Sequence, residues 1–173
     1  RKQAQAVILA PSRELVMQIH QEIQKWAKGT DVTSSAFIGG ANIKKQVEKL
    51  KKKPHIVVGT TGRLIELMKM KKLKMHEVKT IVVDEFDLMI SSEHIREVKD
   101  IIKATLKERQ VLFFSATLSD ETENVAESLL QNHEIVKMEA NLDNLKVDHV
   151  YVYSELRDKM EALRSISYFK GIK

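Results

Sequence analysis

The sequence predicts an α/β domain built on a parallel sheet with helices on both faces. Short apolar or β-branched runs alternate along the chain with stretches in which apolar residues recur every three or four positions. Alternation of strand and helix favours a parallel sheet with right-handed crossovers. With 173 residues, of which 43% are hydrophobic, the chain has the length of about one such domain.

The expected strands are bounded by Gly, Pro or charged residues, as buried parallel strands are. In chain order they are Ala6–Ala10, Ser34–Ile38, Ile56–Gly59, Thr80–Asp84, Val111–Ser115 and Glu134–Met138.

Amphipathic helices are expected between these strands, with apolar stripes that point toward the core. The stripes are Leu15, Ile19, Ile23 and Trp26; Ile43, Val47 and Leu50; Ile95, Val98, Ile102 and Leu106; and Val125, Ala126, Leu129 and Leu130. Ser12 and Ser119 are expected to cap helices. Because Trp26 continues a stripe, we expect it in the core and not as a platform for stacked bases.

Composition permits nucleic-acid binding without requiring it. Lys and Arg number 29 against 24 Asp and Glu, a formal net charge of +5. The absence of cysteine excludes a disulfide framework or a thiolate metal site, and it favours a reducing, cytoplasmic location. No apolar run is long enough to span a membrane, and the first residues do not resemble a signal peptide.

The pattern changes near the end of the chain. Residues 139–148 are polar and indicate a linker, and His149–Tyr153 alternates like a new strand. The segment 149–173 is too short to form a core alone. We therefore expect one domain over residues 1–138 and the start of a second at 149–173.

Two expected strands end on polar groups that packing alone does not explain. The strand at Thr80 runs into Asp84, Glu85 and Asp87, and the strand at Val111 runs into Ser115, Ala116 and Thr117. Ligands of open α/β sheets bind beyond the carboxyl ends of the strands. Either turn alone is compatible with a solvated strand-to-helix connection. Together they favour a nucleoside triphosphatase, in which carboxylates hold Mg²⁺ and orient water.

With these turns the chain carries a set of motifs in a recognisable order. Pro11-Ser12-Arg13-Glu14-Leu15 resembles PTREL, Gly39-Gly40 matches GG, Thr60-Thr61-Gly62-Arg63 resembles TPGR, Asp84–Asp87 resembles DEAD and Ser115-Ala116-Thr117 matches SAT. In this order and spacing the chain resembles the first RecA-like domain of a DEAD-box RNA helicase over residues 1–138. The resemblance implies a RecA-like P-loop NTPase fold, ATP and Mg²⁺ as cofactors, and RNA as partner.

The resemblance also implies roles for the acidic residues. Asp84 and Glu85 would hold Mg²⁺ through water, and Glu85 would accept a proton from the water that attacks the γ-phosphate. Asp87 would hydrogen-bond the hydroxyls of Ser115 and Thr117 and so couple ATP hydrolysis to unwinding. A simple helix cap is the alternative role for Asp87.

RNA contacts are implied at the remaining motifs, where glycine turns, helix N-termini and arginines favour phosphate. The residues are Pro11, Arg13, Gly39, Gly40, Thr60, Gly62 and Arg63. Such contacts read the backbone and the 2′-hydroxyls, so binding to single-stranded RNA without sequence preference is expected. The lysine clusters at 51–53 and 69–74 are interpreted as solvated surface.

Two substitutions within the motifs change the local packing. Phe86 stands where the family has alanine, and its ring must find space against a neighbouring helix or strand. Thr61 stands where the family has proline, which loses the preset φ of a first helical turn at small cost. The three acidic residues of the DEFD sequence are intact.

The sequence contains no G-x-x-x-x-G-K-[ST] segment, which in the family precedes PTREL. We therefore expect a piece of an ATP-dependent RNA helicase that is inactive alone. Two alternatives are an RNA-binding adaptor that has lost its ATPase activity, which the retained acidic residues disfavour, and a DNA helicase of the wider superfamily, which the PTREL-like and SAT motifs disfavour.

The missing phosphate-loop strand has a structural consequence if, as we expect, it lies between the Thr80–Asp84 and Val111–Ser115 strands. Its absence would leave unpaired backbone groups facing each other. The favoured solution is insertion of the His149–Tyr153 strand by exchange with a neighbouring copy. Direct closure of the two strands and an upstream segment absent from this chain are the alternatives.

Overall fold

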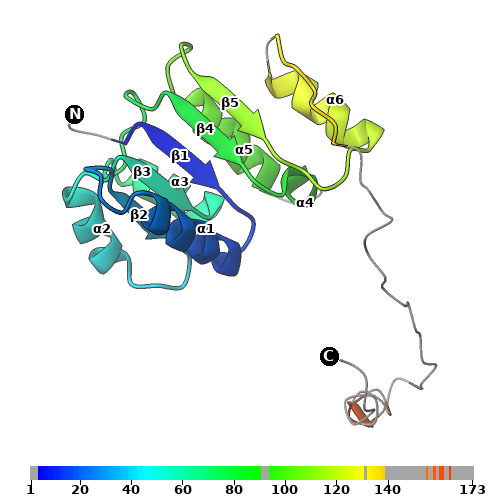
Figure 1. Cartoon of the computed structure of the whole chain (residues 1–173), viewed down its shortest axis with the longest axis horizontal. Coiled ribbons are helices and arrows are strands. Elements are labelled where there is room, and N and C mark those ends of the chain that lie inside the picture. The colour runs from blue at the N-terminus through cyan, green and yellow to red at the C-terminus, as the bar shows by residue number, and fades with distance from the viewer. Residues whose placement is uncertain are drawn as a thin grey trace. The chain divides into compact units, whose positions relative to one another are not determined.

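The computed structural model describes residues 4–90, 94–130 and 132–138, together with the isolated positions 155, 158, 160, 161 and 164. The chain divides into two compact units, one ending at His133 and the other beginning at Glu134. The fold below is that of the first unit (Figure 1). The predicted strand at His149–Tyr153 lies outside the described residues.

A parallel five-stranded sheet forms the centre of this unit. Its strands are β1 (Ala6–Leu9), β2 (Ser34–Phe37), β3 (Ile56–Gly59), β4 (Thr80–Val83) and β5 (Gln110–Phe113), in the spatial order β2-β3-β1-β4-β5. The chain builds β2 and β3 on one side of β1 and then crosses to the other side for β4 and β5 (Figure 1). In open α/β sheets such a change of direction marks the place where ligands bind.

The helices connect these strands in alternation, as predicted. They are α1 (Arg13–Trp26), α2 (Ile43–Lys51), α3 (Thr61–Lys69), α4 (Phe86–Ile90), α5 (His94–Lys103) and α6 (Asp120–Leu129). The Ser12 hydroxyl accepts from the Leu15 N–H at 3.1 Å, and the Ser119 hydroxyl accepts from the Thr122 N–H at 3.2 Å, so both predicted caps are present. None of the described helices is both long and apolar enough to cross a membrane.

Side chains that alternate along the strands form one cluster of buried residues on each face of the sheet. Val7, Leu9 and Ile81 belong to the larger cluster, against which apolar residues of α2 to α6 pack. The smaller cluster includes Ala36 and Val58. Among the described helices, only α1 contributes buried residues to it. Both faces therefore carry helices, and the predicted fold class is confirmed.

Three local predictions are wrong. Trp26 is 78% exposed. It ends the 14-residue helix α1, which is about 21 Å long and so extends past strands of about 13 Å. Leu106 follows the end of α5 and is exposed. Residues 134–138 form no strand, and Val136 and Met138 are exposed.

The Thr80 and Val111 strands, which were expected to flank a gap, adopt the direct closure given above as an alternative to strand exchange. β4 and β5 pair directly, with Thr80 opposite Gln110 and Val83 opposite Phe113. Their facing N–H and C=O groups therefore satisfy each other, so there is no gap between the strands. Direct pairing removes the reason to expect strand exchange between copies. In the described sheet, a further strand can join only at an outer edge, beside β2 or β5.

Candidate functional site

The residues singled out in the sequence come together along one edge of the sheet, beyond the carboxyl ends of the parallel strands. The order across this edge is the glycine loop (Ile38–Asn42) after β2, the start of α3 after β3, and the start of α1 after β1. The carboxylate turn (Asp84–Asp87) follows β4, and the hydroxyl turn (Ser115–Thr117) follows β5. The motifs to which the resemblance assigns RNA contacts therefore occupy the β2–β3–β1 half of the edge, and those to which it assigns the nucleotide occupy the β4–β5 half.

The carboxylate turn holds two half-buried acids at the end of β4. The Asp84 N–H donates to the Leu9 carbonyl at 2.9 Å and extends the pairing of β4 with β1. Glu85 has a φ of 48°, and its N–H donates to Asp84 Oδ1 at 2.9 Å. A left-handed conformation costs a residue with a side chain about 1–3 kcal/mol, and such strain persists where the surrounding structure enforces it. The strained turn keeps both carboxylates at the end of the strand.

The Phe86 side chain is buried and packs against β5. Its side chain is 1% exposed and stacks on Phe113 of β5, with ring centroids 4.1 Å apart and an interplanar angle of 18°. Its N–H donates to the Phe114 carbonyl at 2.9 Å. The aromatic residue therefore joins the carboxylate turn to β5 below the site and leaves the acids at the surface.

Asp87 joins the carboxylate turn to the hydroxyl turn. The Thr117 hydroxyl donates to Asp87 Oδ2 at 2.7 Å, and the Ser115 hydroxyl donates to the Thr117 carbonyl at 2.6 Å. The hydrogen bond from Thr117 lowers the pKa of Asp87; burial opposes this shift, and the Ser115 hydroxyl adds to it. The ionised form of Asp87 is therefore the one that holds the two turns together.

Asp84 and Glu85 are suited to bind a hard cation whose remaining ligands are water or substrate oxygens. Within the described ranges, no group of three or more His, Cys, Asp and Glu residues is placed to hold a metal. Mg²⁺ usually retains several waters and binds through one or two carboxylates together with substrate phosphates. Half-buried Asp84 and Glu85 fit that requirement.

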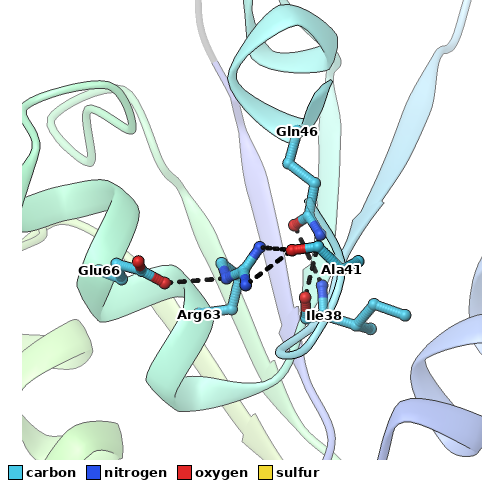
Figure 2. Close-up of polar contacts among 5 residues, drawn as sticks. All are labelled: Ile38, Ala41, Gln46, Arg63 and Glu66. Atoms are coloured by element: carbon cyan, nitrogen blue, oxygen red, sulfur yellow. Dashed lines mark hydrogen bonds and ion pairs between the residues drawn. The ribbon is translucent and has the colours of Figure 1, made fainter. Parts of the chain in front are cut away.

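In the other half of the edge, the glycine loop is held from both sides by two buried side chains, of which Gln46 lies outside the motifs and Arg63 belongs to one (Figure 2). Gln46 of α2 is 4% exposed, and it donates to the Ile38 carbonyl at 3.0 Å while accepting from the Ile38 N–H at 3.2 Å. A glutamine beside the apolar stripe of α2 was the sequence signal for this contact, because a buried amide requires partners.

Arg63 holds the other side of the glycine loop. Its side chain is only 8% exposed, and Nη1 and Nη2 each donate to the Ala41 carbonyl at 3.0 Å. Its Nε makes no hydrogen bond but lies 3.0 Å from Glu66 Oε2 in an ion pair (Figure 2). The guanidinium that the sequence suggested for phosphate is thus engaged inside the protein, where it braces α3 against the loop.

Arg13 lies over the same loop and remains exposed. Gly40 has a φ of 76°, and a Cβ at this position would lie 2.6 Å from Arg13 Nη2. A side chain at Gly40 would therefore meet both backbone strain and the guanidinium. The glycine allows a cationic side chain to rest on the loop while facing solvent.

The start of α3 completes this half. Thr60 occupies the N-cap position without a side-chain cap hydrogen bond, whereas Ser12, Asn42 and Ser119 each cap their helices. Gly62 in the first turn is exposed. N–H groups of an uncapped first turn favour an anion. Pro11 is half-buried at the neighbouring start of α1.

Comparison with known proteins agrees with this arrangement. Residues 1–125 match the family model of the DEAD/DEAH box helicase. The chain is 55% identical over 173 residues to the "Probable ATP-dependent RNA helicase YfmL" of Bacillus subtilis, covering 99% of the chain and 46% of the relative. It is 48% identical to the DEAD-box ATP-dependent RNA helicase CshC of Bacillus cereus, covering 99% of the chain and 44% of the relative.

Solved structures of similar fold include the yeast DEAD-box splicing factor Prp28. That similarity has a TM-score of 0.68 at 34% identity, over 74% of this chain and 31% of the other. Dbp5 of S. cerevisiae has a TM-score of 0.72 at 26% identity, over 80% of this chain and 35% of the other. The chain spans less than half the length of the two curated relatives named above. The motifs, the fold and the family match together show that this chain belongs to the DEAD/DEAH box helicase family.

Proposed function

We propose that the whole protein is an ATP-dependent RNA helicase in which this chain supplies part of the ATP site and one RNA-binding edge. The observation that carries the proposal is the single sheet edge, where an acidic turn and a glycine–arginine surface lie side by side. The two relatives named as RNA helicases match the chain over 99% of its length. The cysteine-free composition supports a cytoplasmic location.

In the ATP site, Asp84 and Glu85 are the carboxylates that would hold Mg²⁺ through water, and the ion would neutralise charge on the phosphates. Glu85 is proposed to accept a proton from the water that attacks the γ-phosphate. The hydrogen bond from the Glu85 N–H to Asp84 supports this role, because it holds the turn that carries the general base.

The Asp87–Thr117 hydrogen bond is proposed to couple hydrolysis to RNA remodelling. It links the carboxylate turn to the hydroxyl turn, and Ser115 orders the hydroxyl turn from within. A change at the nucleotide would therefore reach the β5 side of the edge through one ionised contact.

In the RNA site, exposed Arg13, the Gly39-Gly40 backbone and the uncapped start of α3 at Thr60 and Gly62 are proposed to contact phosphates. Pro11 shapes the adjoining turn. Arg63 acts here as a brace for the glycine loop, since its guanidinium is buried and bound to Ala41. Contacts of this kind carry no base specificity, so we propose binding without sequence preference.

The test is steady-state ATPase activity of the full-length protein at saturating RNA. Glu85→Gln keeps the shape and removes the base, and we expect a loss of turnover of about 10²–10⁴-fold with RNA affinity retained. Glu108→Gln, at a side chain that is 93% exposed, is the matched control and is expected to leave turnover unchanged. Near-normal turnover of Glu85→Gln would remove Glu85 from its role.

A further inference from the structure

Thr61, where the family has proline, is bound to a helix that carries none of the motifs. The Thr61 side chain is 1% exposed, and its hydroxyl donates to Glu97 Oε2 of α5. The same hydroxyl lies 3.1 Å from His94 Nδ1, which is itself 3.4 Å from Glu97 Oε2. A buried hydroxyl, a carboxylate and an imidazole thus meet where α3 begins.

The first turn of α3 lacks the usual local means of stabilisation. Thr60 provides no side-chain cap, and the first turn contains no acidic residue. The Glu97 carboxylate lies beside this turn from outside the helix, with its Oε1 3.3 Å from where a Cβ on Gly62 would be. A negative charge beside a helix N-terminus is stabilising.

Proline at the first position of a helix fixes φ in advance. Threonine does not, so in this chain the orientation of the first turn depends on tertiary contacts. Arg63 ties the turn to the glycine loop through Ala41, and Thr61 ties it to α5 through Glu97.

We propose that Glu97, with His94 beside it, is a positioning residue for the RNA-binding edge. Its hydrogen bond with Thr61 does for the first turn of α3 what proline does in the family motif. The proposal deepens the proposed function and rests on it, because the turn that Glu97 holds is the one assigned to RNA at Thr60 and Gly62. Glu97 itself touches no RNA in this account.

The test is a mutant cycle on this chain, read by fluorescence anisotropy with a labelled single-stranded RNA at low salt. Thr61→Val and Glu97→Ala should each weaken binding about 3- to 10-fold, the range expected for one hydrogen bond. The double variant should be no weaker than either single variant. Thr61→Pro should bind like the wild type and should make Glu97→Ala nearly neutral.

Two control variants separate the effect of the Thr61–Glu97 hydrogen bond from the effect of removing a negative charge. Glu97→Gln keeps an acceptor for Thr61 and removes the negative charge, so we expect affinity at least equal to that of the wild type. Asp100→Ala removes an exposed acid from the same helix and should not reproduce the loss caused by Glu97→Ala. Additive losses in the double variant, or equal effects of Glu97→Ala and Glu97→Gln, would overturn the proposal.

Amide hydrogen exchange gives a readout that does not depend on RNA. Thr61→Val and Glu97→Ala should speed exchange at Leu64, whose N–H donates to the Thr60 carbonyl at 3.1 Å, and Thr61→Pro should restore protection in the Glu97→Ala background. Unfolding in urea shows whether each variant is folded. If the wild-type chain fails to bind RNA, the RNA-binding edge assigned to it is wrong, and exchange still decides whether Glu97 holds the turn. Unchanged exchange in both single variants would overturn the positioning role.

Discussion

The two halves of the site edge differ in how they are held. In the β2–β3–β1 half, buried Gln46 and Arg63 brace the glycine loop with hydrogen bonds to its backbone. In the β4–β5 half, β5 is an edge strand with no fully buried residue, and Phe114 beyond it is 55% exposed. Among the described residues, buried polar side chains thus hold the β2–β3–β1 half, whereas an aromatic stack and an ionised contact, together with backbone hydrogen bonds, hold the β4–β5 half. The halves should respond differently to mutation, to ligands and to pH.

The largest expected effect comes from the aromatic stack of the β4–β5 half. Phe86→Ala removes a ring that is 1% exposed and stacked on Phe113, and should lower the free energy of unfolding by about 3–5 kcal/mol. Urea unfolding of this chain measures the loss. Leu88→Ala, at a side chain that is 57% exposed on the same helix, is the control and should change it little.

Because Phe86→Ala restores the family residue without touching the acids, the full-length variant should retain ATPase turnover if it stays folded. A small loss of stability would show that the β4–β5 half is held by contacts other than the stack.

Removing the Arg63 brace of the β2–β3–β1 half should lower the free energy of unfolding by less than Phe86→Ala does, and its structural effect should be local to the glycine loop. Arg63→Met keeps much of the buried stem and removes both hydrogen bonds to Ala41, which should cost about 1.5–3 kcal/mol of unfolding free energy. RNA affinity should fall with it, because the glycine loop is released. A loss of RNA affinity without any loss of stability would instead indicate that Arg63 contacts RNA directly.

The smallest expected effect is the loss, at low pH, of the stability that the Asp87–Thr117 contact contributes. The pKa of Asp87 is lowered in the folded protein, so its contact with Thr117 contributes stability above the unfolded pKa of about 3.9. That contribution is lost as pH falls through the folded pKa. The difference in melting temperature between wild type and Thr117→Val should therefore be present at neutral pH and shrink toward zero in strong acid. A difference that does not change with pH would show that Asp87 ionisation does not support this contact.

Local patterns in the sequence predict much of this fold. For the five strands of the sheet, the predicted ends agree to within a residue or two, since apolar runs and their polar boundaries are local properties. Helix α3 is absent from the predicted stripes, although Leu64 and Leu67 are buried at helical spacing. The order of β4 and β5 depends on which edges pair in three dimensions, and no local pattern encodes it.

The site residues also divide into those that local motifs locate and those that depend on tertiary packing. The motifs place Asp84, Glu85, Asp87 and Thr117 at the correct edge, and resemblance supplies their implied roles. Buried Arg63 and the Thr61–Glu97 bond were not predictable, because each joins segments that are distant in sequence and depends on how α3 packs.

The most direct test of the difference between the halves is to titrate this one chain with both ligands. We expect RNA binding that weakens about 20-fold between 50 and 200 mM salt, as about three neutralised phosphates of a single strand require, with equal affinity for two unrelated single strands. In calorimetry with Mg-ATP we expect no micromolar binding, because the sequence has no phosphate-binding loop to offset desolvation of the triphosphate. Micromolar ATP binding together with RNA binding that is absent or insensitive to salt would contradict the account.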